Sequence, residues 1–141
     1  MPKRIAIVED EAELASLIEY NLTRQGYETH VLGGSSGTLK ALEQAKPDLI
    51  ILDVMLPETD GFELCRRIRT HKQSKYTYII IITALIGKKD YLEGMDAGAD
   101  DFVTKPFDPD ELKARLRVAQ RIISFQEQLA AAEATAGTDI A

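Results

Sequence analysis

The sequence predicts an α/β fold in which a five-stranded parallel sheet is enclosed between helices. Short apolar runs alternate with amphipathic stretches along the chain, which is typical of repeated strand–helix units. The runs at 49–52 and 79–82 are apolar at consecutive positions, as expected for central strands that are buried on both faces. A chain of 141 residues, of which 45% are hydrophobic and 28% charged, fits one globular domain with a single core.

Each element is predicted from its own local signal. Strands are expected near residues 4–9, 27–32, 48–53, 78–83 and 101–104. Helices are expected at about 12–25, at about 37–45, after Asp60-Gly61, at about 88–97, and from Asp108-Pro109, where a capping residue precedes a proline in the first turn. The apolar spacing predicts that the first helix buries Leu14, Leu17, Ile18 and Leu22, and the third Phe62, Cys65 and Ile68.

The fifth helix carries two apolar stripes. One should face the sheet, and it consists of Leu112, Leu116, Ala119 and Ile123. The other steps by four, three, four and three residues, which is the spacing of a heptad seam: Val118, Ile122, Phe125, Leu129 and Ala132. We therefore expect a domain at 1–124 and a helical extension with a flexible tail at 125–141, with a homodimer through this helix as one hypothesis. A single fifth helix with a frayed end is the alternative.

Bulk composition excludes several classes of function. A net charge of −6 and a pI near 4.9 argue against direct binding of nucleic acid, which needs a basic face. The single cysteine, Cys65, excludes an internal disulfide and suits a reducing compartment. The longest apolar stretches have only the length of strands, so neither a signal peptide nor a membrane span is expected, and a cytoplasmic location is the default prediction.

Reactive groups follow four of the predicted strands. Glu9-Asp10, Asp53, Thr83 and Lys105 each come directly after an apolar run. Because the carboxyl ends of parallel strands meet at one edge of a sheet, these groups should lie close together there. Three crowded carboxylates repel one another unless a cation lies among them. The pattern predicts a small hard metal ion, with Asp53 as an exposed nucleophile on a rigid strand. The alternative interpretation, for each of these residues taken singly, is an ordinary structural role.

The same residues resemble the receiver domain of two-component response regulators. The matching segments are Glu9-Asp10, Asp53, Met55-Leu56-Pro57 before Asp60-Gly61, Thr83-Ala84, Gly98-Ala99-Asp100-Asp101 and Lys105-Pro106-Phe107. They occur in the family's order and at its spacing, and the resemblance covers roughly residues 3 to 122. It implies the flavodoxin-like strand order 2-1-3-4-5, in which the ends of the first and third strands are neighbours.

The resemblance also implies a phosphoacceptor function. Asp53 would take a phosphoryl group from a phosphohistidine of a sensor histidine kinase or a histidine phosphotransfer protein. Mg²⁺, with Mn²⁺ as a substitute, would be bound by Asp10 and Asp53 directly, by Glu9 through water, and by the backbone carbonyl of Met55. Lys105 would neutralise the phosphoryl oxygens, aimed by a cis bond to Pro106.

Thr83, followed by Ala84, would donate its hydroxyl to the phosphoryl group. The resemblance makes Phe102 the switch aromatic, which moves inward when Thr83 moves and so alters the face formed by the fourth helix, fifth strand and fifth helix. Ordinary core packing is the alternative for Phe102. Several charged positions that receivers of transcription factors use for dimer salt bridges are only partly filled here, which argues against their standard dimer.

Two other functions compete with a self-phosphorylating and self-dephosphorylating regulator. Haloacid-dehalogenase-type phosphatases also combine an Asp nucleophile with Mg²⁺, Thr and Lys, but they place a second Asp two residues after the nucleophile. Met55 occupies that position here. A vestigial receiver that only binds proteins is the third candidate, and the intact set of Glu9, Asp10, Asp53 and Lys105 argues against it.

Overall fold

The computed structural model describes residues 3–34, 37–56, 60–71, 75–85 and 87–139, with side chains described as far as 134. Ser35 and Ser36 of the expected turn, and Pro57 of the expected loop, lie outside the described residues. Five strands and five helices alternate along the chain. The strands are β1 (Arg4–Val8), β2 (Glu28–Leu32), β3 (Leu49–Asp53), β4 (Tyr78–Thr83) and β5 (Asp101–Thr104). The helices are α1 (Ala12–Arg24), α2 (Thr38–Ala45), α3 (Gly61–Thr70), α4 (Lys88–Asp96) and α5 (Pro109–Asp139).

The strands form one parallel sheet in the order β2-β1-β3-β4-β5, which confirms the predicted fold. All residues of β3 and β4 are buried, as their continuous apolar sequences predict. The register pairs Val8 with Leu52, so the residues that follow β1 emerge beside the end of β3. The sheet therefore fixes where the side chains at its carboxyl edge stand.

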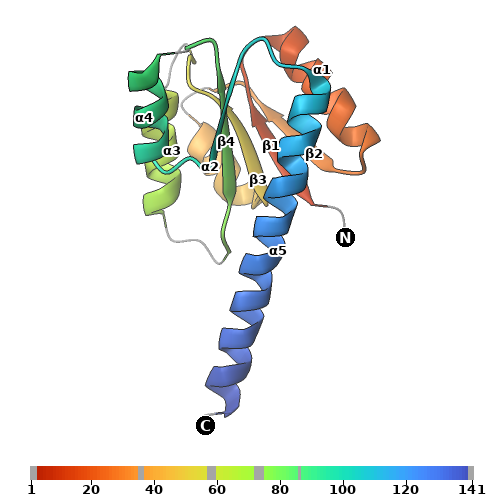
Figure 1. Ribbon diagram of the computed structural model, residues 1–141, viewed down its shortest axis with the longest axis vertical. Helices are drawn as coiled ribbons and strands as arrows, with labels where there is room; N and C mark the ends of the chain where they lie inside the picture. The colour runs from red at the N-terminus through yellow and green to blue at the C-terminus, as the bar shows by residue number, and fades with distance from the viewer. Residues whose placement is uncertain (1–2, 35–36, 57–59, 72–74, 86, 140–141) are drawn as a thin grey trace.

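Helices cover both faces of the sheet (Figure 1). One apolar cluster joins α1 and α5 to the sheet, and the other joins α2, α3 and α4 to the opposite face. The predicted inward stripe of α5 is confirmed, because at most 4% of each of its side chains is exposed: Leu112, Leu116, Ala119 and Ile123. The inward residues predicted for α3 are confirmed in the same way: Phe62, Cys65 and Ile68.

The prediction for α1 was wrong at one position. Ile18 and Leu22 are buried, but Leu17 is 52% exposed. Each residue turns an α-helix by about 100°, so Leu17 cannot share the narrow face centred on Ile18. Ala15 takes the remaining place in the core. An exposed leucine therefore lies beside the inward face of α1 and not within it.

Helix α5 is much longer than the sheet that it covers, and its C-terminal part projects from the body of the molecule (Figure 1). An ion pair between Lys3 and Glu127 joins the start of the chain to the first turn of the projecting part. Among the residues that the structure describes, no helix has both the length and the apolar character needed to cross a bilayer.

Candidate functional site

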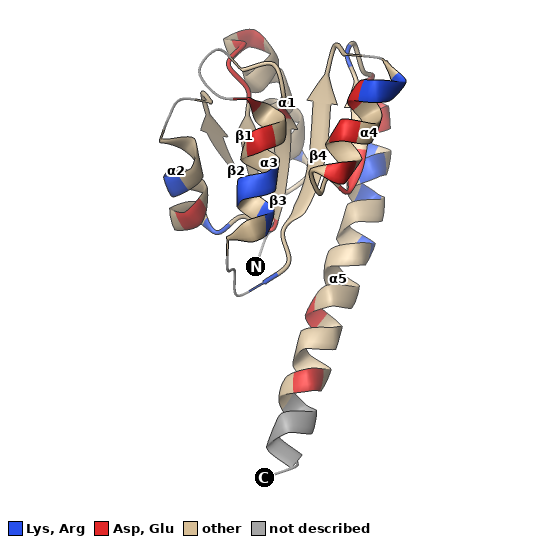
Figure 2. Ribbon diagram, turned by 90° about the vertical axis from the view of Figure 1, so that its left-hand side faces the viewer, with Lys and Arg blue, Asp and Glu red and all other residues tan. Residues whose placement is uncertain are grey.

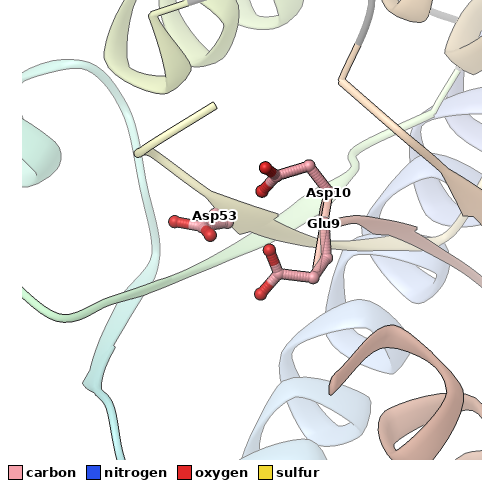
Figure 3. Close-up of side chains that lie close together, drawn as sticks. All are labelled: Glu9, Asp10 and Asp53. Carbon is pink, nitrogen blue, oxygen red and sulfur yellow. The ribbon is translucent and has the colours of Figure 1, made fainter. Parts of the chain in front are cut away.

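Three carboxylates gather at the ends of β1 and β3 (Figure 3). Asp53 is the last residue of β3, and Glu9 and Asp10 follow β1 directly. Each contributes a carboxylate oxygen, and the three oxygens lie within 4.8 Å of one another. Glu9 and Asp53 are buried, whereas Asp10 is exposed. Carboxylate oxygens that converge in this way form a donor set that suits a hard divalent cation such as Mg²⁺.

Lys105 lies at the same edge of the sheet. Its Nζ donates hydrogen bonds to Glu9 Oε1 at 2.7 Å and to Asp53 Oδ2 at 2.9 Å. Its backbone N–H donates to the carbonyl oxygen of Thr83 at 2.8 Å, and the bond to Pro106 is cis, as the resemblance implies. Burial by itself would lower the pKa of Lys105, but the hydrogen bonds to the two acids raise it. The ammonium group therefore stays charged between two carboxylates.

Glu9 titrates near neutral pH. Burial is the largest cause, and together with the neighbouring Asp53 it raises the pKa of Glu9 to about 7, against the opposing effect of Lys105. Only 2% of Glu9 is exposed. A cation that uses this carboxylate must therefore compete with a proton as well as with the ammonium group of Lys105.

Asp53 is less accessible than its position at a strand end suggests. Its exposed fraction is 3%, so the expectation of an exposed carboxylate was wrong. Oδ1 accepts the backbone N–H of Met55 at 2.9 Å, and Oδ2 accepts from Lys105. Two chain segments thus close over the end of β3 and hold the orientation of this carboxylate.

The loop after β3 returns tightly to form the start of α3. Met55 pairs with Asp60 in an isolated bridge, and the Asp60 carboxylate accepts the N–H of Phe62 at 2.9 Å as the helix cap. A Cβ atom on Gly61 would lie 2.2 Å from the Cα of Val54, so this position accepts only glycine. The Met55 side chain is 56% exposed beside the acidic cluster.

Thr83 ends β4 and is completely buried. Its Oγ1 accepts the backbone N–H of Leu85 at 3.1 Å, which leaves its own hydroxyl hydrogen free to be donated elsewhere. Ala84 next to it is exposed. Phe102 on β5 is half-buried and meets the edge of Tyr91 on α4, with ring centroids 5.5 Å apart.

The sequence reasoning missed an apolar groove beside Lys105. It has a volume of about 480 Å³ and lies between α1 and the segment that joins β5 to α5. Its lining includes Leu14, Leu17, Pro106, Phe107 and Leu112. The signal that could have revealed it is Leu17, an apolar residue beyond those needed for the inward face of α1.

Comparison with known proteins gives consistent matches. A family model described as the response regulator receiver domain matches residues 5–117. The chain is 43% identical over 122 residues to the alkaline phosphatase synthesis transcriptional regulatory protein PhoP of Bacillus subtilis, covering 86% of this chain and 50% of that protein. It is 47% identical over 119 residues to the response regulator ArlR of Staphylococcus saprophyticus, covering 84% and 52%. The chain therefore spans about half the length of these curated relatives.

Solved structures show the same fold. The BeF3-activated N-terminal receiver domain of Klebsiella pneumoniae RstA superposes with a TM-score of 0.77 at 33% identity, covering 84% of this chain and 98% of that one. A CheY-like receiver domain protein from Methanospirillum hungatei gives a TM-score of 0.78 at 25% identity, covering 91% and 98%. The residues matched by the family model include the acidic cluster at the ends of β1 and β3 and Lys105 after β5. The chain belongs to the family of response regulator receiver domains of two-component systems.

Proposed function

We propose that this chain is a phosphoacceptor switch in which Asp53 accepts a phosphoryl group from a phosphohistidine. The observation that carries the proposal is the position of Lys105, which hydrogen-bonds Glu9 and Asp53 within the trio of carboxylates. This arrangement combines a carboxylate nucleophile, an ammonium group that can bind the transferred phosphoryl oxygens, and oxygen ligands for a metal. Phosphorylation and Mg²⁺ binding at an acidic pocket are typical of the family.

Phosphoryl transfer here requires positioning more than acid–base catalysis. A carboxylate oxygen of Asp53 attacks phosphorus in line with the P–N bond of the donor. The O–P bond forms as the P–N bond breaks, and the imidazole leaves with the electron pair and takes a proton from solvent. Because a free histidine titrates near ~6.5, it leaves without a general acid from this chain. Lys105 can then turn from the carboxylates to the new phosphoryl oxygens.

Glu9, Asp10, Asp53 and the carbonyl of Met55 are the groups we propose to hold Mg²⁺, with Mn²⁺ as a substitute. When bound, the ion neutralises charge that develops on the phosphoryl oxygens. Hydrolysis ends the signal when water attacks phosphorus, breaks the O–P bond and releases inorganic phosphate. Met55 and Leu85 on the flanking loops have apolar side chains that cannot orient this water, so we expect slow hydrolysis.

Thr83 and Phe102 are the residues we propose to convert phosphorylation into a change of surface. The Thr83 hydroxyl accepts the N–H of Leu85 and has its own hydrogen to donate to a phosphoryl oxygen, towards which it would move. Its movement would open space into which Phe102 turns, away from its contact with Tyr91. The face of α4, β5 and α5 would then present a different surface to an output or a partner.

The phosphohistidine donor is a sensor histidine kinase or a histidine phosphotransfer protein in this proposal. The apolar groove beside Lys105 supports such a partner, because Leu17 and Phe107 can bury the apolar side of a helix that carries the histidine. A second copy of the chain, paired through α5, is the other proposed partner. We propose a cytoplasmic location, no direct contact of this chain with nucleic acid, and none with a membrane.

A phosphatase of the haloacid-dehalogenase type and a vestigial binding module remain the competing functions. The first would need an acid two residues after the nucleophile, where Met55 lies. The second would have no need for Lys105 to be held by hydrogen bonds between two carboxylates. As a phosphoacceptor, the chain would catalyse its own phosphorylation and dephosphorylation and no reaction on an independent substrate.

Incubation with acetyl phosphate and Mg²⁺ separates the three functions. We expect a phosphoryl adduct that is stable in acid and labile in base, seen by intact mass analysis. Asp53→Asn should abolish it, and Asp96→Asn, which changes an exposed acid on α4, should not. No adduct on the wild type would favour the vestigial module, and an equal adduct on Asp53→Asn would refute Asp53 as the acceptor. Rapid turnover of phosphate esters would favour the phosphatase.

A further inference from the structure

The outer side of α5 exposes a row of large apolar side chains. Val118 is 43% exposed, Phe125 63% and Leu129 57%, and Ile122 between them is half-buried. Helix α5 continues beyond the sheet and carries few charges in its projecting part (Figure 2). Between 125 and 134 the charged residues are Glu127 and Glu133. Water-facing helices ordinarily carry a polar outer side, so this row is suited to a partner.

The spacing of the row indicates what kind of partner fits. Val118, Ile122, Phe125, Leu129 and Ala132 form the seam of a heptad repeat, with Ile122 and Leu129 at position a and the other three at position d. A repeat of seven keeps such a seam facing a second helix that has the same repeat. The chain itself supplies that helix in a second copy.

We propose that two copies of this chain pair through the seam as a parallel two-stranded coiled coil. The inference rests on the pairing through α5 proposed above, and not on the phosphoryl chemistry. In the parallel alignment each seam residue meets its own counterpart across a two-fold axis. The flanking positions then place Arg121 beside Gln126 of the other copy and Gln128 beside Glu133, so no like charges meet.

The opposite alignment is less favourable. An antiparallel pair centred on Phe125 brings Glu133 of one copy against Ala119 of the other. Ala119 is completely buried on the sheet, so the carboxylate would be pressed against the body of the domain. Burying an unpaired carboxylate is costly, whereas the parallel alignment leaves Glu133 at the open tip of the helix.

The seam supports only a weak dimer. It spans about two heptads, and short helices need partner contacts to stabilise them. A stable interface buries about 800 Å² and about 20–30 residues on each partner, whereas the seam consists of five residues. The fraction of dimer should therefore depend on protein concentration. Small changes elsewhere in the molecule can then alter this fraction.

Sedimentation equilibrium over a series of concentrations tests the pairing. We expect the mean mass of the wild type to rise towards that of a dimer. Phe125→Glu should weaken dimerisation by about tenfold or more, because it places two carboxylates in the seam. Gln120→Glu adds the same charge on the exposed side away from the seam and should behave like the wild type. A wild type that stays monomeric, or an unchanged Phe125→Glu, overturns the proposal.

Cysteine cross-linking tests the alignment on the full chain. Ala132→Cys should form a disulfide between copies, and Ser124→Cys, which points away from the seam, should not. Cys65 does not interfere, because it is completely buried and burial raises the pKa of its thiol to about 11. If Ala132→Cys instead links to Val118→Cys in a mixture of the two variants, the parallel alignment is wrong. The phosphoryl adduct on Asp53 should be the same in every variant, which separates this inference from the proposed function.

Discussion

Lys105 places a positive charge among the carboxylates of the site. Without it, a metal ion alone would have to balance their negative charge. Its Nζ lies 2.7 Å from a Glu9 oxygen and 2.9 Å from an Asp53 oxygen. The same ammonium group therefore has two opposite effects. It attracts phosphoryl oxygens, and it repels a divalent cation that approaches Glu9 and Asp53.

Replacement of Lys105 by Met separates these effects. Met keeps much of the side-chain volume and removes the charge, so we expect Mg²⁺ to bind about tenfold more tightly or better. Phosphorylation by acetyl phosphate should become much slower, because no ammonium group stabilises the transferred phosphoryl oxygens. Isothermal titration with Mg²⁺ above the pKa of about 7 of Glu9 measures the first effect.

The matched control for this variant is Lys113→Met, which removes a positive charge from an exposed position on α5. It should alter neither Mg²⁺ binding nor phosphorylation. If Lys105→Met bound Mg²⁺ more weakly than the wild type, Lys105 would be needed to hold the acidic cluster together, and its proposed competition with the metal would be wrong.

The sequence predicts which residues reach this edge of the sheet better than it predicts their environment. Glu9, Asp53 and Lys105 each follow an apolar run, and parallel pairing brings the ends of such runs together. The burial of Asp53 could not be predicted, because it depends on how the loops of Met55 and Lys105 close over the end of β3. Those loops have no periodic pattern from which their path follows.

At the scale of the elements, Arg69 joins three segments at the opposite edge of the sheet. From α3 it donates to the carbonyl oxygen of Gly98 at 2.8 Å and to that of Thr77 at 2.5 Å. It also pairs with Asp100 at 2.6 Å and stacks over the ring of Tyr76. These contacts hold the turn between α4 and β5 against the end of α3 and the start of β4.

Gly98 is the position in this junction at which we expect a substitution to disturb the packing most. Its φ of +108° is rarely adopted by residues with a side chain, and a Cβ atom would lie 2.6 Å from Cγ of Arg69. We expect Gly98→Ala to lower the free energy of unfolding by about 1–3 kcal/mol, measured by urea denaturation. Phosphorylation of Asp53 should persist, since the site lies at the other edge of the sheet.

Gly33→Ala is the control for a general effect of replacing glycine. The φ of Gly33 lies outside the left-handed region, and a Cβ atom added there would have no described atom within 4 Å apart from its chain neighbours. Its replacement should therefore change the free energy of unfolding by less than about 0.5 kcal/mol. Equal effects of the two substitutions would show that the junction with Arg69 places no special demand on Gly98.

The elements themselves were predictable where a periodic pattern specified them. Apolar runs specify β3 and β4, and the spacing of the inward stripe specifies the part of α5 that lies on the sheet. Leu17 shows the limit of this reasoning, because an apolar residue near a helix face can serve the core or a groove. Arg69 was not singled out either, since its partners come from segments that only the folded chain brings together.

At the scale of the whole molecule, α5 belongs to two environments. As far as Ile123 it packs on the sheet, and beyond Ser124 its described side chains are exposed. The pair between Lys3 and Glu127 is a contact between partly exposed groups, and such pairs contribute little stability. The division of the chain into a domain at 1–124 and an extension at 125–141 is a prediction that follows from this difference.

Shortening the chain tests that division. A chain that ends at Ser124 keeps Ala119 and Ile123 in the core and loses only exposed side chains among those described. We expect its free energy of unfolding to change by less than about 1 kcal/mol in urea at low protein concentration, where the dimer is dissociated. A chain that ends at Val118 also loses Ala119 and Ile123, which should cost about 2–5 kcal/mol. If the two shortened chains were destabilised equally, the projecting part of α5 would be an integral part of the domain, and the boundary at 124 would have to move towards the C-terminus.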